Sequence, residues 1–99
     1  MAVKKIIWSK RAKTELNETL EFYLERNGSP DYSLKIILRL ESLTNTLTKN
    51  YFIGRLTSNK STRVIPKEHF LIFYDLGLDF IEIVSFWDNR QDISKRLDH

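Results

Sequence analysis

The sequence contains no cysteine and only two histidines, His69 and His99. The lack of cysteine excludes disulfide bonds, thiolate nucleophiles and cysteine-ligated metal sites, and it fits a reducing cytoplasm. Because one histidine is the last residue, the ligands of a typical zinc site are also missing. We therefore expect neither a metal nor another cofactor.

Other signatures of catalysis or membrane insertion are missing as well. The glycines, Gly28, Gly54 and Gly77, are scattered, so the chain has no glycine-rich phosphate loop. No Gly-x-Ser-x-Gly nucleophile motif occurs. There is neither an apolar run of membrane-spanning length nor a signal-peptide core. These absences predict a cytoplasmic protein that does not bind membranes.

The composition predicts one globular domain over residues 1–99, because 41% of the side chains are apolar and 12% are aromatic. The net charge of +3 is unevenly distributed. Residues 49–67 contain no acidic side chain and five cations, namely Lys49, Arg55, Lys60, Arg63 and Lys67. A segment of one sign favours a polyanion or an acidic protein as partner. A solvated loop and strand edge explains the same run equally well.

The first half of the chain predicts a short strand followed by two helices. Val3 to Trp8 is the strand, and Ser9 supplies an N-cap for a helix from Lys10 to Arg26. Gly28 then suits a left-handed position after the helix. The residues at helical spacing, which we expect to be buried, are Ala12, Leu16, Leu20, Tyr23 and Leu24.

A second helix follows at once, with Ser29 as its cap and Pro30 at its first helical position. The short connection predicts an antiparallel helical hairpin. The apolar side of this helix is expected to consist of Leu34, Ile37, Leu38, Leu40, Leu43 and Leu47.

Residues 60–90 contain three short runs rich in β-branched and aromatic side chains, which predict an antiparallel three-stranded meander. The runs are separated at residues 66–68 and by a loop around Gly77. With the N-terminal strand, the expected fold is α+β, a four-stranded sheet with the helical hairpin on one face. Because both faces of the last two strands are apolar, the uncovered face is the candidate for function or for a partner. Its expected edge consists of Arg63, Lys67, His69, Trp87 and Arg90.

These edge residues allow two interpretations. Arg63 and Lys67 could hold a phosphate, His69 could transfer a proton, and Arg90 could stabilise developing charge, a set able to cleave RNA without a metal. In the alternative, His69 is a polar surface residue and Arg90 pairs with neighbouring aspartates. Trp87 is either a stacking platform for a base or part of the core.

Several motifs, in this order and spacing, resemble the RelE/ParE toxin superfamily of type II toxin–antitoxin modules across essentially the whole chain. They are Trp8-Ser9-x-x-Ala12, Gly54-Arg55, Thr62-Arg63, residues 70–74 (Phe-Leu-Ile-Phe-Tyr), residues 81–84 (Ile-Glu-Ile-Val) and residues 88–92 (Asp-Asn-Arg-Gln-Asp). The resemblance implies a β-α-α-β-β-β fold and a bacterial cytoplasmic toxin that is neutralised by a cognate antitoxin. It implies contact with DNA only indirectly, through the antitoxin.

Two activities occur in the superfamily, inhibition of DNA gyrase by ParE-like members and cleavage of mRNA on the ribosome by RelE-like members. The long predicted hairpin resembles the ParE branch, and Arg63 matches an arginine shared by ParE-like toxins. Where RelE-like nucleases have an arginine, this chain has Pro66-Lys67, and no tyrosine follows Tyr74. We therefore expect a ParE-like gyrase inhibitor, with a RelE-like endoribonuclease, a detoxified antitoxin-binding remnant and a bare nucleic-acid-binding module as alternatives.

The expected site residues follow from this choice. For binding the target or the antitoxin they are Arg55, Arg63, Lys67, Trp87 and Arg90. If the chain is instead a ribonuclease, the catalytic residues are Arg63, Lys67, His69 and Arg90.

Overall fold

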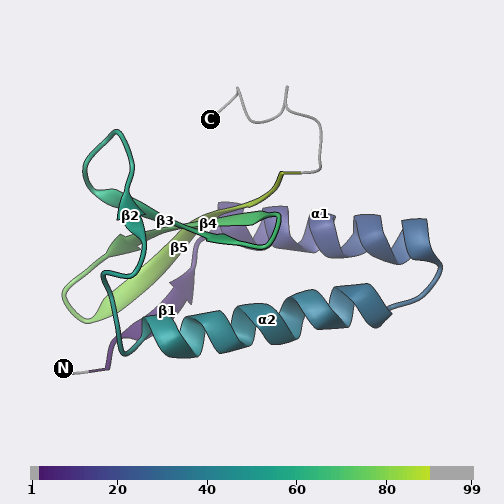
Figure 1. Ribbon diagram of the computed structural model, residues 1–99, viewed down its shortest axis with the longest axis horizontal. Coiled ribbons are helices and arrows are strands. Elements are labelled where there is room, and N and C mark those ends of the chain that lie inside the picture. Colours follow the sequence, from purple (N-terminus) through teal and green to yellow (C-terminus); the bar gives the residue numbers. More distant parts are fainter. Residues whose placement is uncertain (1–2, 90–99) are drawn as a thin grey trace.

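The computed structural model describes residues 3–89 as a sheet with a helical hairpin packed on one face (Figure 1). The helices are α1 (Lys10–Asn27) and α2 (Asp31–Leu47). The strands are β1 (Lys5–Trp8), β2 (Arg55–Leu56), β3 (Thr62–Lys67), β4 (Phe70–Leu76) and β5 (Phe80–Asp88). The expected α+β fold, with its N-terminal strand, helical hairpin and antiparallel meander, is confirmed.

The sheet has five strands in the order β1-β5-β4-β3-β2, with β1 parallel to β5 and the other pairs antiparallel. The sequence predicted four strands, and β2 is the addition. Its two residues pair only with Arg63 and Val64, which is too short for an alternating pattern to reveal. The break predicted at residues 66–68 is also misplaced, because β3 continues through Pro66 and Lys67. Proline is tolerated there because no strand within residues 3–89 pairs with the outer side of β3 at that point.

Helix α1 begins and ends as its caps predict. The Ser9 Oγ accepts a hydrogen bond from the Ala12 amide at 3.0 Å, and Gly28 takes the left-handed conformation with φ 66°. Ala12 and Tyr23 are buried, but Leu24 is exposed, so the prediction for Leu24 is wrong. Position 24 lies about 120° around the helix from Ala12, on the side away from the sheet.

Helix α2 differs more from its prediction. Pro30 is the N-cap residue, one position before the helix, and the Ser29 Oγ accepts from the Asp31 amide at 3.2 Å. Leu40 and Leu47 are buried and Leu43 is partly buried. Leu34, Ile37 and Leu38 are exposed instead of buried, and the helix buries Ser33 and Ile36 in their place. The Ser33 hydroxyl donates to the Leu20 carbonyl at 2.8 Å, so the side of α2 that carries Ser33 faces α1.

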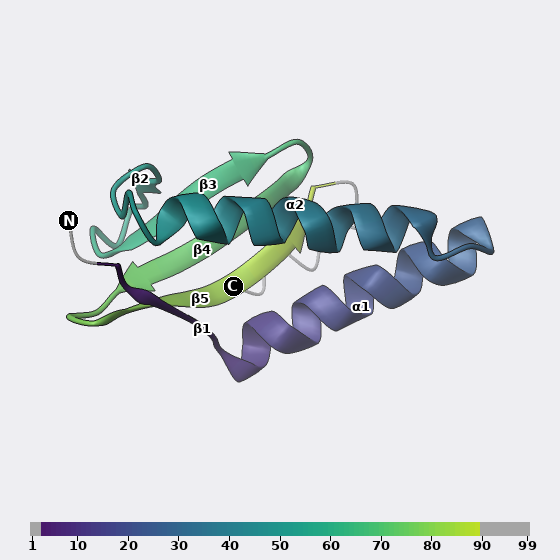
Figure 2. The same cartoon turned by 90° about the horizontal axis from the view of Figure 1, so that it is seen from below.

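The core lies between the sheet and the hairpin. Both helices run along the same side of the sheet and approach each other toward their connecting turn (Figure 2). The sheet contributes alternate side chains of β4 and β5, and the buried Tyr23 hydroxyl donates to the buried Asp88 carboxylate. Neither helix is long and apolar enough to cross a membrane. Among residues 3–89 no helix covers the opposite face of β3, β4 and β5, and we call it the open face.

Candidate functional site

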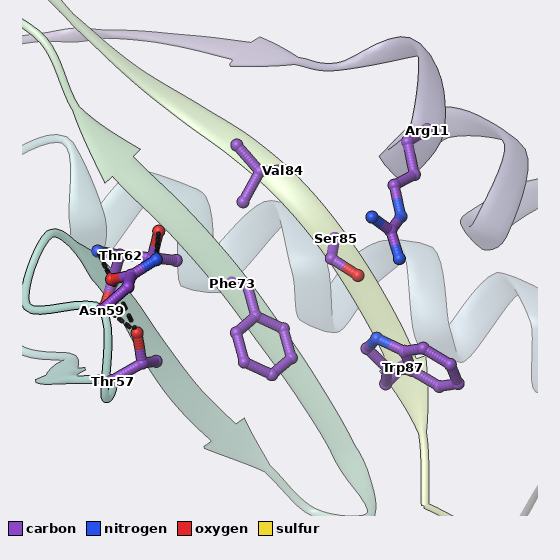
Figure 3. A pocket seen from close by; sticks show the side chains of 8 residues that line it. All are labelled: Arg11, Thr57, Asn59, Thr62, Phe73, Val84, Ser85 and Trp87. Atoms are coloured by element: carbon purple, nitrogen blue, oxygen red, sulfur yellow. Dashed lines mark hydrogen bonds between the residues drawn. The ribbon is translucent and has the colours of Figure 1, made fainter. Parts of the chain in front are cut away.

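The open face carries a groove built from two adjoining pockets of about 300 and 500 Å³. One pocket, shown in Figure 3, is lined by Arg11, Thr57, Asn59, Thr62, Phe73, Val84, Ser85 and Trp87. The other is lined by Arg55, Leu56, Thr57, Ser58, Val64, Leu71 and Phe73. We call these residues together the open-face groove. Its lining combines apolar and aromatic side chains with hydroxyl and amide groups. Within the described part of the chain, its charged side chains are two arginines and it contains no carboxylate.

A bulge in β5 directs two side chains into this groove. Phe73 of β4 lies opposite Ser85, whereas Tyr74 lies opposite Ile83, so Val84 is an extra residue in β5. Beyond the bulge Ser85 and Trp87 project on the open face, while Phe86 enters the core. Trp87 is both buried and part of the groove wall, so the two expectations for it, core or binding surface, meet in one position.

The first turns of α1 cover the edge of β5 where β1 has ended. The Ser9 amide donates to the Ile83 carbonyl at 2.9 Å. Further along α1, Glu15 Oε1 accepts from the Phe86 amide at 3.1 Å and from the Ser85 Oγ at 2.8 Å. A carboxylate from α1 therefore satisfies an edge amide next to the bulge and holds Ser85 in place. Arg11 lies one turn before Glu15, at the mouth of the groove.

The loop between β2 and β3 forms the opposite rim and is ordered by one side chain. Asn59 Oδ1 accepts from the amides of Ser61 and Thr62, both at 2.9 Å. The Thr62 Oγ1 in turn donates to Asp75 at 2.6 Å. Lys60, at the loop tip, has a left-handed φ of 63°. The groove is therefore bounded by fixed polar groups on both sides.

Arg63 lies on the other face of the sheet. It is in register with the buried Tyr74, and its Nη1 donates to the Gly54 carbonyl at 2.6 Å. Its guanidinium carbon lies 5.0 Å from the centroid of the Phe52 ring. These contacts join β3 to the connection between α2 and β2.

The buried hydroxyl of Tyr74 also holds the connection between α2 and β2. It accepts from the Gly54 amide at 2.9 Å and donates to the Tyr51 carbonyl at 2.8 Å. Burial raises the pKa of Tyr74, while the Gly54 hydrogen bond and the nearby Arg63 act in the opposite direction. A Cβ at Gly54 would lie 2.7 Å from the Tyr74 ring, so this position requires glycine.

Lys67 and His69 lie at the far end of β3, also toward the helices. Lys67 is in register with the core residue Phe70 and is exposed. His69 Nε2 and the Tyr32 hydroxyl of α2 form a hydrogen bond of 2.8 Å. Next to it Glu68, with a left-handed φ of 59°, pairs with Arg39 of α2. Both turn residues thus connect the β3–β4 turn to α2.

The prediction that Arg63, Lys67 and His69 edge the uncovered face is therefore wrong. Strand alternation places Arg63 and Lys67 on the same face as the core residues Tyr74 and Phe70. Two other predicted residues, Arg55 and Trp87, do line the open-face groove. Arg90 lies outside the described residues.

Comparison with protein families assigns this fold. Residues 6–93 match the family described as the ParE toxin of the type II toxin-antitoxin system ParDE. The chain belongs to the ParE toxin family. The resemblance to the RelE/ParE superfamily, with its ParE-like branch, is confirmed.

A solved structure supports the same fold assignment. The chain resembles a structure titled as the chromosomal ParDE TA system from P. aeruginosa, with a TM-score of 0.74 and 19% sequence identity. The match covers 87% of this chain and 96% of that chain. No curated protein sequence shows significant similarity.

Sequence reasoning missed three residues that shape the groove of this ParE-family chain. In the sequence, Arg11 and Glu15 are two of several polar positions along α1. Their four-residue spacing is typical of a helical ion pair, and the structure shows that pair with 3.8 Å between Arg11 Nε and Glu15 Oε2. Asn59, within Thr-Ser-Asn-Lys-Ser, carried a turn signal that could have predicted its role in the loop.

Proposed function

We propose that this chain is a ParE-like toxin that arrests bacterial growth by inhibiting DNA gyrase in the cytoplasm. We further propose that a cognate antitoxin neutralises it and mediates any association with DNA. Membership of the ParE toxin family supports the toxin assignment and implies the antitoxin. The helices, of 18 and 17 residues, keep the long hairpin that we associated with the ParE branch.

The observation that favours gyrase inhibition over RNA cleavage is the separation of the residues expected to form a nuclease site. Arg63 and Lys67 lie four residues apart on β3, a span of roughly 13 Å at the rise of an extended strand. His69 lies beyond Lys67 and bonds to Tyr32, whereas Arg63 bonds to Gly54. General acid–base catalysis requires its groups within roughly 3 Å of the reacting atoms. Arg63 and His69 therefore do not converge on one phosphate.

The open-face groove is the surface that we expect to bind the antitoxin, and its lining indicates the kind of segment that fits. Phe73 and Trp87 offer apolar walls, and Arg11 and Arg55 contribute the charged groups of the lining. An extended or helical tail with acidic and apolar residues matches both features. Folding of such a tail over the groove should give nanomolar affinity or better, about 12 kcal/mol of binding free energy.

Two assays test the function. Expression of the chain alone should arrest growth, and co-expression of the antitoxin encoded beside it should restore growth. The purified chain should inhibit gyrase supercoiling and leave a cell-free translation reaction running. Rapid loss of translation with cleavage of mRNA in the ribosomal A site would instead establish the ribonuclease alternative. Normal growth with soluble protein would favour the detoxified remnant.

A further inference from the structure

The connection between α2 and β2 places two apolar side chains next to each other in solvent. Phe52 is 60% exposed and Ile53 is 39% exposed. Leu56 of β2, 49% exposed, is in register with Arg63, whose guanidinium lies against the Phe52 ring. We call Phe52, Ile53 and Arg63 the corner patch, and Leu56 lies where this patch meets the open-face groove.

The corner patch is held rigidly outward. The backbone of Gly54, directly after Ile53, is bonded on both sides, its amide by Tyr74 and its carbonyl by Arg63. Tyr51, directly before Phe52, is buried, and its carbonyl accepts from Tyr74. An exposed apolar loop that is fixed in this way loses little conformational entropy when a partner binds.

The charge at the patch is positive. Residues 49–67 contain five cations and no carboxylate, and of the five Arg63 belongs to the patch and Lys49 lies three residues before Phe52. The two ion pairs within residues 3–89 are Arg11–Glu15 and Arg39–Glu68, neither of which involves this segment's cations. Lys4 adds a further cation, its Nζ 4.7 Å from the centroid of the Tyr51 ring. The complementary surface has an apolar recess for Phe52 surrounded by carboxylates.

We propose that the corner patch is the surface with which the toxin binds an acidic surface of its protein target, on the face of β3 opposite the antitoxin groove. The proposal rests on the toxin function proposed above. Phe52 is the anchor, because it is aromatic, is the most exposed of the three apolar side chains and already has an arginine guanidinium over its ring. The surrounding cations steer the acidic partner and fix its orientation.

Phe52→Ser tests the anchor, and Phe22→Ser is its matched control. Phe22 is also an exposed phenylalanine beside an arginine, with the Arg26 guanidinium 5.9 Å from its ring, but it lies on α1. Phe52→Ser should raise the concentration needed for half-inhibition of gyrase about 30-fold, as expected for an interface hot spot. It should weaken growth arrest in parallel and leave the affinity for the antitoxin unchanged. Phe22→Ser should change none of these readouts.

A charge-reversing substitution tests whether the partner's surface is acidic. Lys49→Glu, beside the patch, should weaken gyrase inhibition about tenfold at low salt, whereas Lys35→Glu on α2 should have no effect. Equal effects of the two reversals would contradict an acidic partner at this corner.

The remaining outcomes separate this proposal from the proposed function. Full inhibition and growth arrest by Phe52→Ser would overturn the proposal, and so would a loss of antitoxin affinity as large as the loss of inhibition. If the unmodified chain arrests growth without inhibiting gyrase, the gyrase assignment fails. The growth arrest caused by Phe52→Ser relative to the unmodified chain then still decides the role of the patch. A chain that does not arrest growth overturns both.

Discussion

Replacement of Tyr74 by phenylalanine should destabilise the fold by about 2–4 kcal/mol, although the ring remains in place. The tyrosine hydroxyl accepts from the Gly54 amide and donates to the Tyr51 carbonyl, and all three residues are buried. Loss of the hydroxyl leaves one donor and one acceptor without a partner, each at about 1–3 kcal/mol. Little relaxation is available, because Arg63 holds the Gly54 carbonyl from the other side.

Tyr51→Phe is the matched control for this change. The Tyr51 hydroxyl is also buried, but it has no hydrogen-bond partner within residues 3–89. Its removal should therefore be neutral or slightly stabilising. Denaturant unfolding followed by circular dichroism measures both variants at neutral pH, with unchanged m-values as the sign that only stability has changed. A cost below about 0.5 kcal/mol for Tyr74→Phe would refute the reasoning, since a lost bond of typical strength is worth more.

The unmodified chain and its Tyr74→Phe variant should also differ in how their stability responds to alkaline pH. Burial raises the pKa of Tyr74 in the folded state above its unfolded value of about 10. The protonated hydroxyl therefore stabilises the fold fully below about pH 10, and this contribution is lost as the pH rises through the folded pKa. The Tyr74→Phe variant has no hydroxyl at this position to ionise. The stability difference between the two chains should shrink above about pH 10, and a constant difference would contradict the buried, protonated tyrosine.

Three further changes test other parts of the molecule. Glu15→Ala should cost about 1–3 kcal/mol in denaturant unfolding, because the Phe86 amide and the Ser85 hydroxyl lose their acceptor, and Glu15→Gln should cost less since its amide oxygen can still accept. His69→Ala should leave growth arrest nearly intact if the chain poisons gyrase, whereas a loss of about a hundredfold in mRNA cleavage would mark a proton-transfer role. Arg55→Glu should weaken antitoxin binding in calorimetry, and an unchanged Kd would exclude the open-face groove as the tail's site.

The sequence predicts those parts of this fold that local chemistry decides. Ser9 and Gly28 mark the ends of α1 because capping depends on a few neighbouring residues. The rotation of α2 is not local. Its apolar residues occupy more than one side of the helix, and which side is buried depends on packing against the rest of the fold, including the contact between Ser33 and the Leu20 carbonyl of the other helix.

The same limit explains the misplaced site residues. Val64 and Ile65 are both buried, one on each face, so apolar alternation along β3 could not indicate which face Arg63 shares. Register with β4 decides it, because Arg63 lies opposite Tyr74. The contributions of Arg11 and Glu15 to the groove arise only because β1 ends early and leaves the edge of β5 to α1. No pattern within either segment contains that information.

The geometry of β2 and β3 also suggests how neutralisation would follow from the two proposed surfaces. Val64 forms a wall of the open-face groove, while Arg63, its neighbour in β3, belongs to the corner patch on the opposite face. The sheet is narrow here, since β2 consists of Arg55 and Leu56 and is the last strand on this side among residues 3–89. Leu56 borders both surfaces, being in register with Arg63 and lining the groove. An antitoxin tail in the groove and a target bound at Phe52 would therefore both occupy the space at Leu56. Overlap at this one edge would exclude the target without any change in the fold.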